Sequence, residues 1–415
     1  MQFYEFKETQ ERVILIGVQT EVGDDVEASL DELEELAETA GAETVAKVIQ
    51  NREAVHPGTY IGKGKIEEVA SLLRALDANG VICDDELSPA QLNNLERELD
   101  CKVMDRTLLI LDIFAGRAVS SEGKIQVELA QLRYRAARLV GLRESLSRLG
   151  GGIGTRGPGE KKLETDRRLI RTRISALKAE LAQVEKHREL IRGKRSRGNL
   201  KTAAIVGYTN AGKSTLLNTL TGAGILAEDK LFATLYPTTR VLELKDGQQI
   251  LLTDTVGFIR KLPHHLVEAF KSTLEEAKYA DYIIHVVDAS NPQAELQMFT
   301  VYETLRELGA TGKKIVTLLN KQDQVTGSGI RDLKADYTVK CSARTGEGLD
   351  EFKDVLAKLL AEDQIYLEEL YPYSEAGKIQ KIREFGTLLS EEYREDGIFV
   401  KARVPAEIFV SVMPK

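Results

Sequence analysis

Hydrophobic positions change their spacing along this 415-residue chain, and each spacing predicts a different kind of element. In residues 1–106, short apolar runs alternate with helix-like stretches, a pattern typical of a parallel sheet covered by helices. The strand-like runs are Val13–Val18, Val45–Ile49, Val81–Cys83 and Lys102–Met104, and an acidic helix places Val26, Leu30, Leu33 and Ala37 inward. We therefore expect a small α/β domain over residues 1–106.

Residues 107–199 have the four-three spacing of long amphipathic helices. One seam consists of Ile125, Leu129, Leu132, Ala136, Leu139 and Leu146, and the other of Ile170, Ile174, Leu177, Leu181, Val184 and Ile191. Two such seams predict a long antiparallel helical hairpin. Its tip would be the glycine-rich string 150–159, followed by Glu160, Lys161 and Lys162.

Strand and helix patterns alternate again over residues 200–363, which predicts a second α/β domain. Its strand-like runs are Ala203–Val206, Ile250–Leu252, Ile315–Leu319 and Tyr337–Lys340. A further strand-like run, Gly397–Val404, predicts a small accessory α/β piece over residues 364–415. The fold class expected for the whole chain is α/β.

Composition agrees with a protein of two to four domains, with 42% hydrophobic and 29% charged residues. No apolar run reaches the roughly 18 residues of a membrane span, and the start does not resemble a secretory signal. These features predict a cytoplasmic protein, with peripheral attachment to a membrane left open. Cys83, Cys101 and Cys341 lie in or beside strand-like runs, so we expect buried thiols.

The net charge of −8 conceals a strong asymmetry. Residues 124–201 carry 21 Lys and Arg against 8 Asp and Glu, a net charge of +13, so the rest of the chain carries −21. Positive charge of this density indicates a phosphate-rich partner. The predicted hairpin, with Arg156, Lys161 and Lys162 at or beside its tip, is therefore a candidate RNA-binding arm.

Residues 207–214 read G-x-x-x-x-G-K-S between a strand-like run and a helix-like one, the context that a phosphate-binding loop requires. Its glycines allow backbone amides to surround a β-phosphate, and the helix N-terminus adds positive potential. Lys213 would reach the β- and γ-phosphates, and the Ser214 hydroxyl would bind Mg²⁺. The sequence thus predicts a site for a nucleoside triphosphate.

The base is predicted by N-K-x-D at residues 320–323, at the end of a strand-like run. The Asp323 carboxylate can accept from the N1–H and the 2-amino group of guanine, whereas adenine would leave it unpaired. Asn320 would brace the phosphate loop, and the stem of Lys321 would cover the ring. The backbone of Ser342 and Ala343 would contact the guanine carbonyl. The predicted ligand is GTP or GDP.

A D-T-x-G motif at residues 254–257 follows another strand-like run. Asp254 would hold Mg²⁺ through water, and the Gly257 amide would approach the γ-phosphate. The segment 231–240 lies where a γ-phosphate sensor is expected. Thr234, Thr238 and Thr239 are the candidate Mg²⁺ ligands there. The string F-A-T-L-x-P at residues 232–237 resembles the switch of the Obg and HflX group of GTPases, and this resemblance points to Thr234.

Phe258 follows the D-T-x-G motif at the position where many GTPases carry a glutamine that orients the attacking water. A phenylalanine cannot do this, so intrinsic hydrolysis should be slow or use another group. Asn210 offers two alternatives that the sequence leaves open, since it either helps to hold K⁺ or only caps a turn.

Together these motifs define the predicted site. The catalytic residues are Lys213, Thr234 and Gly257, and the metal ligands are Ser214 and Thr234. The predicted nucleotide contacts are Gly207, Tyr208, Thr209, Asn210, Ala211, Gly212, Lys213, Ser214, Phe232, Ala233, Thr234, Leu235, Tyr236, Asp254, Thr255, Val256, Gly257, Asn320, Lys321, Gln322, Asp323, Ser342, Ala343 and Arg344.

Four strings of residues give the chain a family resemblance: 60–65 (Y-I-G-K-G-K), 154–160 (G-T-R-G-P-G-E), 232–235 (F-A-T-L) and 254–260 (D-T-V-G-F-I-R). Together they resemble bacterial HflX, in the Obg and HflX group of translation-factor-related GTPases. The resemblance implies a ribosome-associated GTPase that binds the large subunit and separates or rescues stalled ribosomes. It also implies that the N-terminal domain and the hairpin reach toward the peptidyl-transferase region.

Two classes of function therefore remain. The first is a GTP-hydrolysing factor that splits or rescues ribosomes through their large subunit and its RNA. The second is a GTPase that acts in ribosome assembly or remodels another RNA–protein partner. Neither class involves DNA.

Overall fold

The computed structural model of the chain describes residues 11–20, 25–149, 158–196, 200–222, 231–232, 237–245, 247–261, 276–325 and 329–414. Within these ranges, the side chains of residues 140–149, 158–163, 185, 187–196, 406 and 407 are not described. The chain folds into two compact units. The first contains residues 1–185, 229–235 and 260–272, and the second contains residues 186–228, 236–259 and 273–415. The predicted domain boundaries at 106, 199 and 363 stay predictions.

The first unit contains a parallel sheet with the strand order β2-β1-β3-β4. Its elements are β1 (Arg12–Gln19), α1 (Val26–Thr39), β2 (Glu43–Asn51), α2 (Lys63–Ala75), β3 (Gly80–Cys83), α3 (Pro89–Leu99), β4 (Lys102–Asp105) and α4 (Arg106–Arg117). β1 and β3 are buried along almost their whole length because they are the inner strands of the sheet. The predicted parallel arrangement of this region is confirmed.

Local sequence explains where the helices of this unit begin. Asp25 caps α1 by accepting a hydrogen bond from the Ala28 amide at 3.0 Å. Ser88 caps α3 through a reciprocal pair of bonds with Gln91, and Pro89 follows at the first helical position. Such side chains satisfy amides that have no partner within the first helical turn.

A buried carboxylate at the end of β4 anchors the next helix, α5 (Ser121–Leu149). Asp105 is fully buried and caps α4 by accepting from the Leu108 amide at 2.9 Å. Its two oxygens also accept from the Tyr134 hydroxyl at 2.8 Å and from Arg138 Nη2 at 2.5 Å. α5 therefore packs against α3 and α4 with a charged anchor at its centre.

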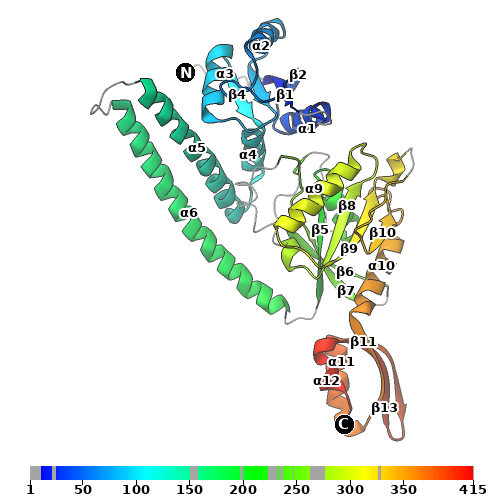
Figure 1. Cartoon of the computed structure of the whole chain (residues 1–415). Helices are drawn as coiled ribbons and strands as arrows, with labels where there is room; N and C mark the ends of the chain where they lie inside the picture. The colour runs from blue at the N-terminus through cyan, green and yellow to red at the C-terminus, as the bar shows by residue number, and fades with distance from the viewer. Residues whose placement is uncertain are drawn as a thin grey trace, which may run out of the picture. The chain divides into compact units, whose positions relative to one another are not determined.

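The antiparallel partner of α5 is α6 (Pro158–Ser196), as Figure 1 shows. Arg173 of α6 joins them through two bonds to Glu128, at 2.7 and 2.9 Å. The glycine-rich tip and Arg156 lie outside the described residues, as do the side chains of Lys161, Lys162, Leu146 and Ile191.

The predicted apolar seams of this hairpin coincide only in part with the buried faces of its two helices. Among the described seam positions, only Leu129 and Leu177 are fully buried, and the others are half-buried: Ile125, Leu132, Ala136, Leu139, Ile170, Ile174, Leu181 and Val184. On α5 the buried stripe also includes Val127, Ala130 and Tyr134. The reason is that α5 packs against α3 and α4, so its buried stripe is turned toward them.

The second unit is built on a six-stranded sheet with the order β10-β9-β8-β5-β7-β6, parallel except for β6. Its elements are β5 (Lys201–Gly207), α7 (Lys213–Thr221), β6 (Thr238–Glu243), β7 (Gln249–Asp254), β8 (Tyr282–Asp288), α9 (Ala294–Glu307), β9 (Lys314–Asn320), β10 (Tyr337–Lys340) and α10 (Leu349–Glu362). The strand predictions for residues 203–206, 250–252, 315–319 and 337–340 are confirmed.

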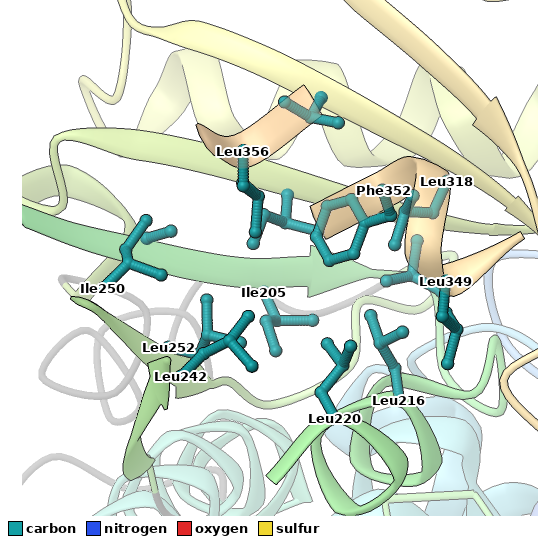
Figure 2. Close-up of a cluster of buried hydrophobic side chains, with 14 of the residues drawn as sticks. Ile205, Leu216, Leu220, Leu242, Ile250, Leu252, Leu318, Leu349, Phe352 and Leu356 are labelled. Carbon is teal, nitrogen blue, oxygen red and sulfur yellow. The ribbon is translucent and has the colours of Figure 1, made fainter. Parts of the chain in front are cut away.

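One face of this sheet packs on α7 and α10. Figure 2 shows the buried cluster between them, in which Ile205 of β5 and Leu252 of β7 lie near Leu216 of α7, and Phe352 of α10 lies beside Leu318 of β9. Burial of these side chains fixes the helix N-termini against the carboxyl ends of the strands. That edge of the sheet carries the phosphate-loop, D-T-x-G and N-K-x-D motifs.

The last segment forms a three-stranded antiparallel sheet, β11-β13-β12, packed on α11 and α12. Its elements are β11 (Gln364–Tyr371), α11 (Ala376–Phe385), β12 (Thr387–Arg394), β13 (Gly397–Pro405) and α12 (Ala406–Val412). The predicted strand at 397–404 is confirmed, as is the α/β fold class of the chain.

Two further expectations can be compared with the structure. Cys83 and Cys341 are buried free thiols, whereas Cys101 is half-buried, because it lies in the turn between α3 and β4. None of the helices in the described part of the chain is long and apolar enough to cross a membrane.

Candidate functional site

The phosphate-loop motif occupies the turn between β5 and α7 of the second unit. Gly212 adopts φ +97°, and a Cβ atom there would lie 2.3 Å from Asn320 Nδ2. A Cβ atom at Gly207 would lie 2.2 Å from the Val286 carbonyl oxygen. Both positions therefore require glycine. Asn210, inside the loop, has φ +59°, which asparagine tolerates better than most residues.

Lys213 is the buried cation of this loop, with an exposed fraction of 5%. Its Nζ donates to the Tyr208 carbonyl oxygen at 2.6 Å, so the side chain folds back over the loop. Burial lowers the pKa of Lys213 to about 8, and the nearby Asp254 only partly opposes this. A buried cation whose charged form is disfavoured is suited to an incoming anion.

A hydroxyl and a carboxylate meet beside this lysine. Ser214 Oγ, in the first turn of α7, donates to Asp254 Oδ2 at 2.8 Å. Asp254 is fully buried at the end of β7. Oxygen donors of this kind are the ligands that Mg²⁺ prefers, and Mg²⁺ sites usually combine one or two protein ligands with phosphates and water. No group of three or more His, Cys, Asp and Glu in the described ranges could hold a metal by itself.

The D-T-V-G-F segment is fastened to the phosphate loop. The Thr209 amide donates to the Phe258 carbonyl at 2.8 Å, and the Phe258 amide donates to the Gly207 carbonyl at 3.1 Å. Thr255 Oγ1 donates to the Ile205 carbonyl at 2.7 Å. Phe258 is buried to 2% exposure, so its side chain serves the packing of this junction.

Gly257 lies directly against the phosphate loop. A Cβ atom at this position would lie 2.9 Å from Lys213 Nζ and 2.8 Å from Thr209 Cα. Only a glycine leaves room there, and its backbone lies beside the lysine ammonium. The two residues predicted to contact a γ-phosphate are thus neighbours in the structure.

Asn320 joins the phosphate loop to the base-recognition loop. It is 3% exposed, its Nδ2 donates to the Ala211 carbonyl at 2.8 Å, and its Oδ1 accepts from the Ala343 amide at 2.8 Å. The Ser342 amide donates to the Glu347 carbonyl at 3.0 Å. The amides of Ser342 and Ala343, which would contact a guanine carbonyl, therefore already donate to groups within the protein. The bracing function predicted for Asn320 fits this geometry.

The remaining residues of the guanine motif lie just after β9. Lys321 has φ +61°, and its Nζ pairs with Asp288 Oδ2 at 2.7 Å. Asp323 lies in a short 3₁₀ helix, Gln322–Gln324, and is exposed to solvent. Arg344 is also exposed, in the turn before α10. The carboxylate that would select guanine is therefore accessible to a ligand.

Of the predicted switch residues, Phe232 alone is described, and it belongs to the first unit. Ala233, Thr234, Leu235 and Tyr236 lie outside the described residues. The alternatives Thr238 and Thr239 begin β6, where Thr239 Oγ1 lies 3.0 Å from Thr253 Oγ1.

Sequence reasoning missed two supports of the site. Asp288, which holds Lys321, could have been found because it ends an apolar strand at the same sheet edge as the known motifs. The second is Asp332, which accepts from Thr317 Oγ1 and Tyr302 at 2.6 Å each and lies 3.7 Å from the buried His285 Nδ1. Burial lowers the pKa of His285. His285 lies in an apolar run, and nothing in that run indicates that it lies beside Asp332.

Three protein families match successive parts of the chain. Residues 27–115 match "GTP-binding GTPase N-terminal", residues 117–195 match "GTP-binding GTPase Middle Region", and residues 202–321 match "50S ribosome-binding GTPase". Among curated relatives, the GTPase HflX of Lacrimispora saccharolytica is 68% identical over 409 residues, which cover 98% of this chain and 97% of that protein.

More distant relatives have the same name. The GTPase HflX of Escherichia coli K12 is 41% identical over 400 residues, covering 95% of this chain and 94% of that protein. Among solved structures, a GTP-binding protein from Sulfolobus solfataricus in complex with GDP is 26% identical with a TM-score of 0.45, covering 85% of this chain and 99% of that one.

Proposed function

The chain belongs to the HflX family of GTPases, and from that premise we propose that it is a GTP-hydrolysing factor that binds the large ribosomal subunit and splits or rescues stalled ribosomes. That it is a GTP-hydrolysing enzyme follows from the family itself. The observation that supports the ribosomal partner is the match of residues 202–321 to a family described as 50S ribosome-binding GTPases. The charge of +13 over residues 124–201 supports RNA as the surface that it contacts.

In the proposed site, the loop Gly207–Ser214 surrounds the β-phosphate with backbone amides, and Lys213 turns from the Tyr208 carbonyl toward the β- and γ-phosphates. Ser214, Asp254 and a switch threonine, Thr234 in the first place, would hold Mg²⁺. When bound, the ion would neutralise charge on the phosphate oxygens. Asp323 selects guanine, and Asn320 keeps the two loops at a fixed separation through its bonds to Ala211 and Ala343.

Hydrolysis must proceed without a glutamine at residue 258, because the buried Phe258 cannot orient water. The Gly257 amide would stabilise charge on the γ-phosphate, and the remaining activation would come from switch segments ordered by the ribosome. K⁺ bound near Asn210 is the alternative source of positive charge. We expect slow turnover by the isolated protein.

The hairpin of α5 and α6 would contact ribosomal RNA through Arg156, Lys161 and Lys162. α6 carries further exposed cations, Arg168, Arg171 and Lys178. Contacts of this kind are made mainly to phosphates, so they position the protein without reading a base sequence. The location expected from such a partner is the cytoplasm.

Sedimentation with ribosomal particles tests this proposal. The protein would be mixed with intact ribosomes or isolated large subunits, with a non-hydrolysable GTP analogue or with GDP. We expect analogue-dependent binding to large subunits and a loss of intact ribosomes. Binding to large subunits without loss of intact ribosomes would instead favour a function in ribosome assembly, and no binding to either would refute the proposal.

A matched pair of variants tests the hairpin. Replacing Arg156, Lys161 and Lys162 by alanine should reduce the slope of log affinity against log salt by roughly 2 to 3, since fewer counterions are released. The control removes three exposed cations elsewhere, Lys245, Arg306 and Lys381. If both triple variants reduced the salt slope equally, the tip would make no special contact with the ribosome.

A further inference from the structure

The N-terminal sheet carries an acidic cluster at the edge where folds of its kind bind ligands. Its strand order reverses between β1 and β3, and ligands of open parallel sheets bind beyond the carboxyl ends of the strands at such a reversal. Asp84 and Asp85 directly follow β3 at this point. Asp84 is 1% exposed, and it accepts from Arg106 Nη1 at 2.8 Å and from Ser29 Oγ at 2.8 Å.

A lysine 177 residues further along the chain than Asp84 occupies this edge. Lys261 Nζ donates to Asp84 Oδ2 at 2.5 Å and to Asp85 Oδ1 at 2.6 Å. Asp85 also accepts from the Tyr60 hydroxyl at 2.7 Å. Burial alone would raise the pKa of Asp84, yet Arg106 and Lys261 together hold it below its usual value. The cluster is therefore charged and internally paired.

The position of Lys261 in the sequence gives this pairing its significance. It lies four residues after Gly257, in the short segment 260–272 that belongs to the first unit, whereas Gly257 belongs to the second. Four residues span at most about 14 Å, so the chain keeps Lys261 within that distance of Gly257. Lys261 has φ +52°, a conformation that is uncommon for residues other than glycine.

The other phosphate-sensing segment is held in a similar way. Phe232 belongs to the first unit, has φ +57° and is 2% exposed. Its ring packs edge-on against Phe114 of α4, with 4.7 Å between the ring centroids. Both segments that flank the predicted γ-phosphate site thus send a side chain into the N-terminal unit, one apolar and one charged.

We propose that the Asp84–Asp85 pair is a receptor for the Lys261 ammonium and that, with the Phe114–Phe232 contact, it couples the nucleotide state to the N-terminal unit. This inference rests on the proposed function, in which Gly257 contacts the γ-phosphate. We call the pairing of Lys261 with Asp84 and Asp85 the latch; in the structure that contains it, Gly257 also lies against Lys213, the other predicted γ-phosphate contact. The latch therefore favours GTP over GDP, and by reciprocity GTP strengthens the latch.

The test compares affinities of the isolated full-length protein for GDP and for a non-hydrolysable GTP analogue. Lys261→Gln should weaken analogue binding by roughly 5- to 20-fold, the size of typical couplings between sites, and change GDP affinity by less than about twofold. Lys261→Arg keeps the cation and should behave as the wild type. Lys261→Glu should act as Lys261→Gln does or more strongly, and adding Asp85→Lys should restore part of the loss.

Lys245→Gln is the matched control, because Lys245 also pairs with two aspartates, Asp350 and Asp354, but on the surface of the second unit. It should leave both affinities unchanged. Hydrogen exchange supplies a second measurement: in the wild type, the amides of residues 80–85 should be better protected with the analogue than with GDP, and this difference should vanish in Lys261→Gln.

The outcomes separate the latch from the proposed function. An unchanged ratio of the two affinities in Lys261→Gln and Lys261→Glu, with normal GDP binding, would overturn the latch alone. If Lys261→Gln lowers analogue affinity as expected but the wild type binds no ribosomal particles in the sedimentation experiment, the latch stays in place and the ribosomal function is removed.

Discussion

Two sheets in this protein, one parallel and one parallel except for β6, place polar residues at the carboxyl ends of their parallel strands, and the two edges have opposite chemistry. The edge in the second unit presents glycine-lined backbone amides and the buried Lys213. The edge in the first unit presents Asp84, Asp85 and Asp105. Burial lowers the pKa of Lys213, whereas the cations around Asp84 keep its carboxyl ionised although it is buried.

This difference distinguishes a binding edge from an internally paired one. A buried charge that is poorly compensated within the protein gains most from an external partner of opposite charge. A buried charge with partners on several sides stabilises the fold or couples its parts, and its removal leaves the partners unpaired. The first case describes Lys213, and the second describes the cluster around Arg106.

The largest expected effect comes from breaking the paired edge. Arg106 is 1% exposed and contacts Asp84 and Glu32. Arg106→Met should therefore destabilise the first unit by about 3–5 kcal/mol, because it leaves a buried carboxylate without its main partner. Urea unfolding would measure the loss. GDP affinity, measured below the unfolding range, should stay within about twofold of the wild type, and a large change there would mean that the two edges are not separable.

Breaking the binding edge should have the converse effect. Lys213→Ala should weaken GDP binding by roughly 100-fold or more, about 3 kcal/mol, since charge-assisted bonds to phosphate are lost. The thermal unfolding of the protein without nucleotide should be little changed, because the charged form of Lys213 is itself disfavoured by burial. Near-normal GDP affinity in this variant, measured with a fluorescent analogue, would remove Lys213 from the site.

The smallest effect is a pH dependence of binding. Bound phosphate favours the protonated lysine, so affinity should be highest below the Lys213 pKa of about 8 and should fall as pH rises through it. Between pH 7 and pH 9 the loss should be about tenfold, one pKa unit being about 1.4 kcal/mol. Lys213→Arg is the control, since arginine stays protonated and its remaining affinity should lack this step. Equal slopes of log affinity against pH for the wild type and Lys213→Arg would show that Lys213 does not cause the pH dependence.

The binding edge could largely be predicted from the sequence because its chemistry is local. A glycine loop or an N-K-x-D turn requires particular residues at fixed spacing, and each motif follows an apolar strand. The family resemblance, drawn from four such strings, is confirmed by the relatives named above. The contacts of Asn320 show how such a residue can act through its neighbours, although the predicted ligand contacts themselves stay predictions.

The paired edge could not be predicted because its members are far apart in the sequence. Arginine and lysine usually lie at the protein surface, so nothing in the sequence marks Arg106 and Lys261 as partners of a buried carboxylate. Only the fold brings them to Asp84. The seam predicted on α5 was partly wrong for a similar reason. Helical spacing identifies an apolar stripe, but it does not say that Tyr134 and Arg138 turn toward Asp105. Both cases concern contacts whose partners lie on other elements.

The most direct test of the central claim, that the carboxyl edge of the second unit selects guanine through Asp323, is a titration of the wild type and Asp323→Asn with GDP and xanthosine diphosphate. An amide at residue 323 can donate to the 2-oxo group of xanthine but cannot accept both guanine protons. We predict that the variant binds GDP at least roughly 100-fold more weakly and binds xanthosine diphosphate more tightly than GDP, the reverse of the wild-type order. Unchanged GDP affinity and an unchanged order of preference would contradict the claim.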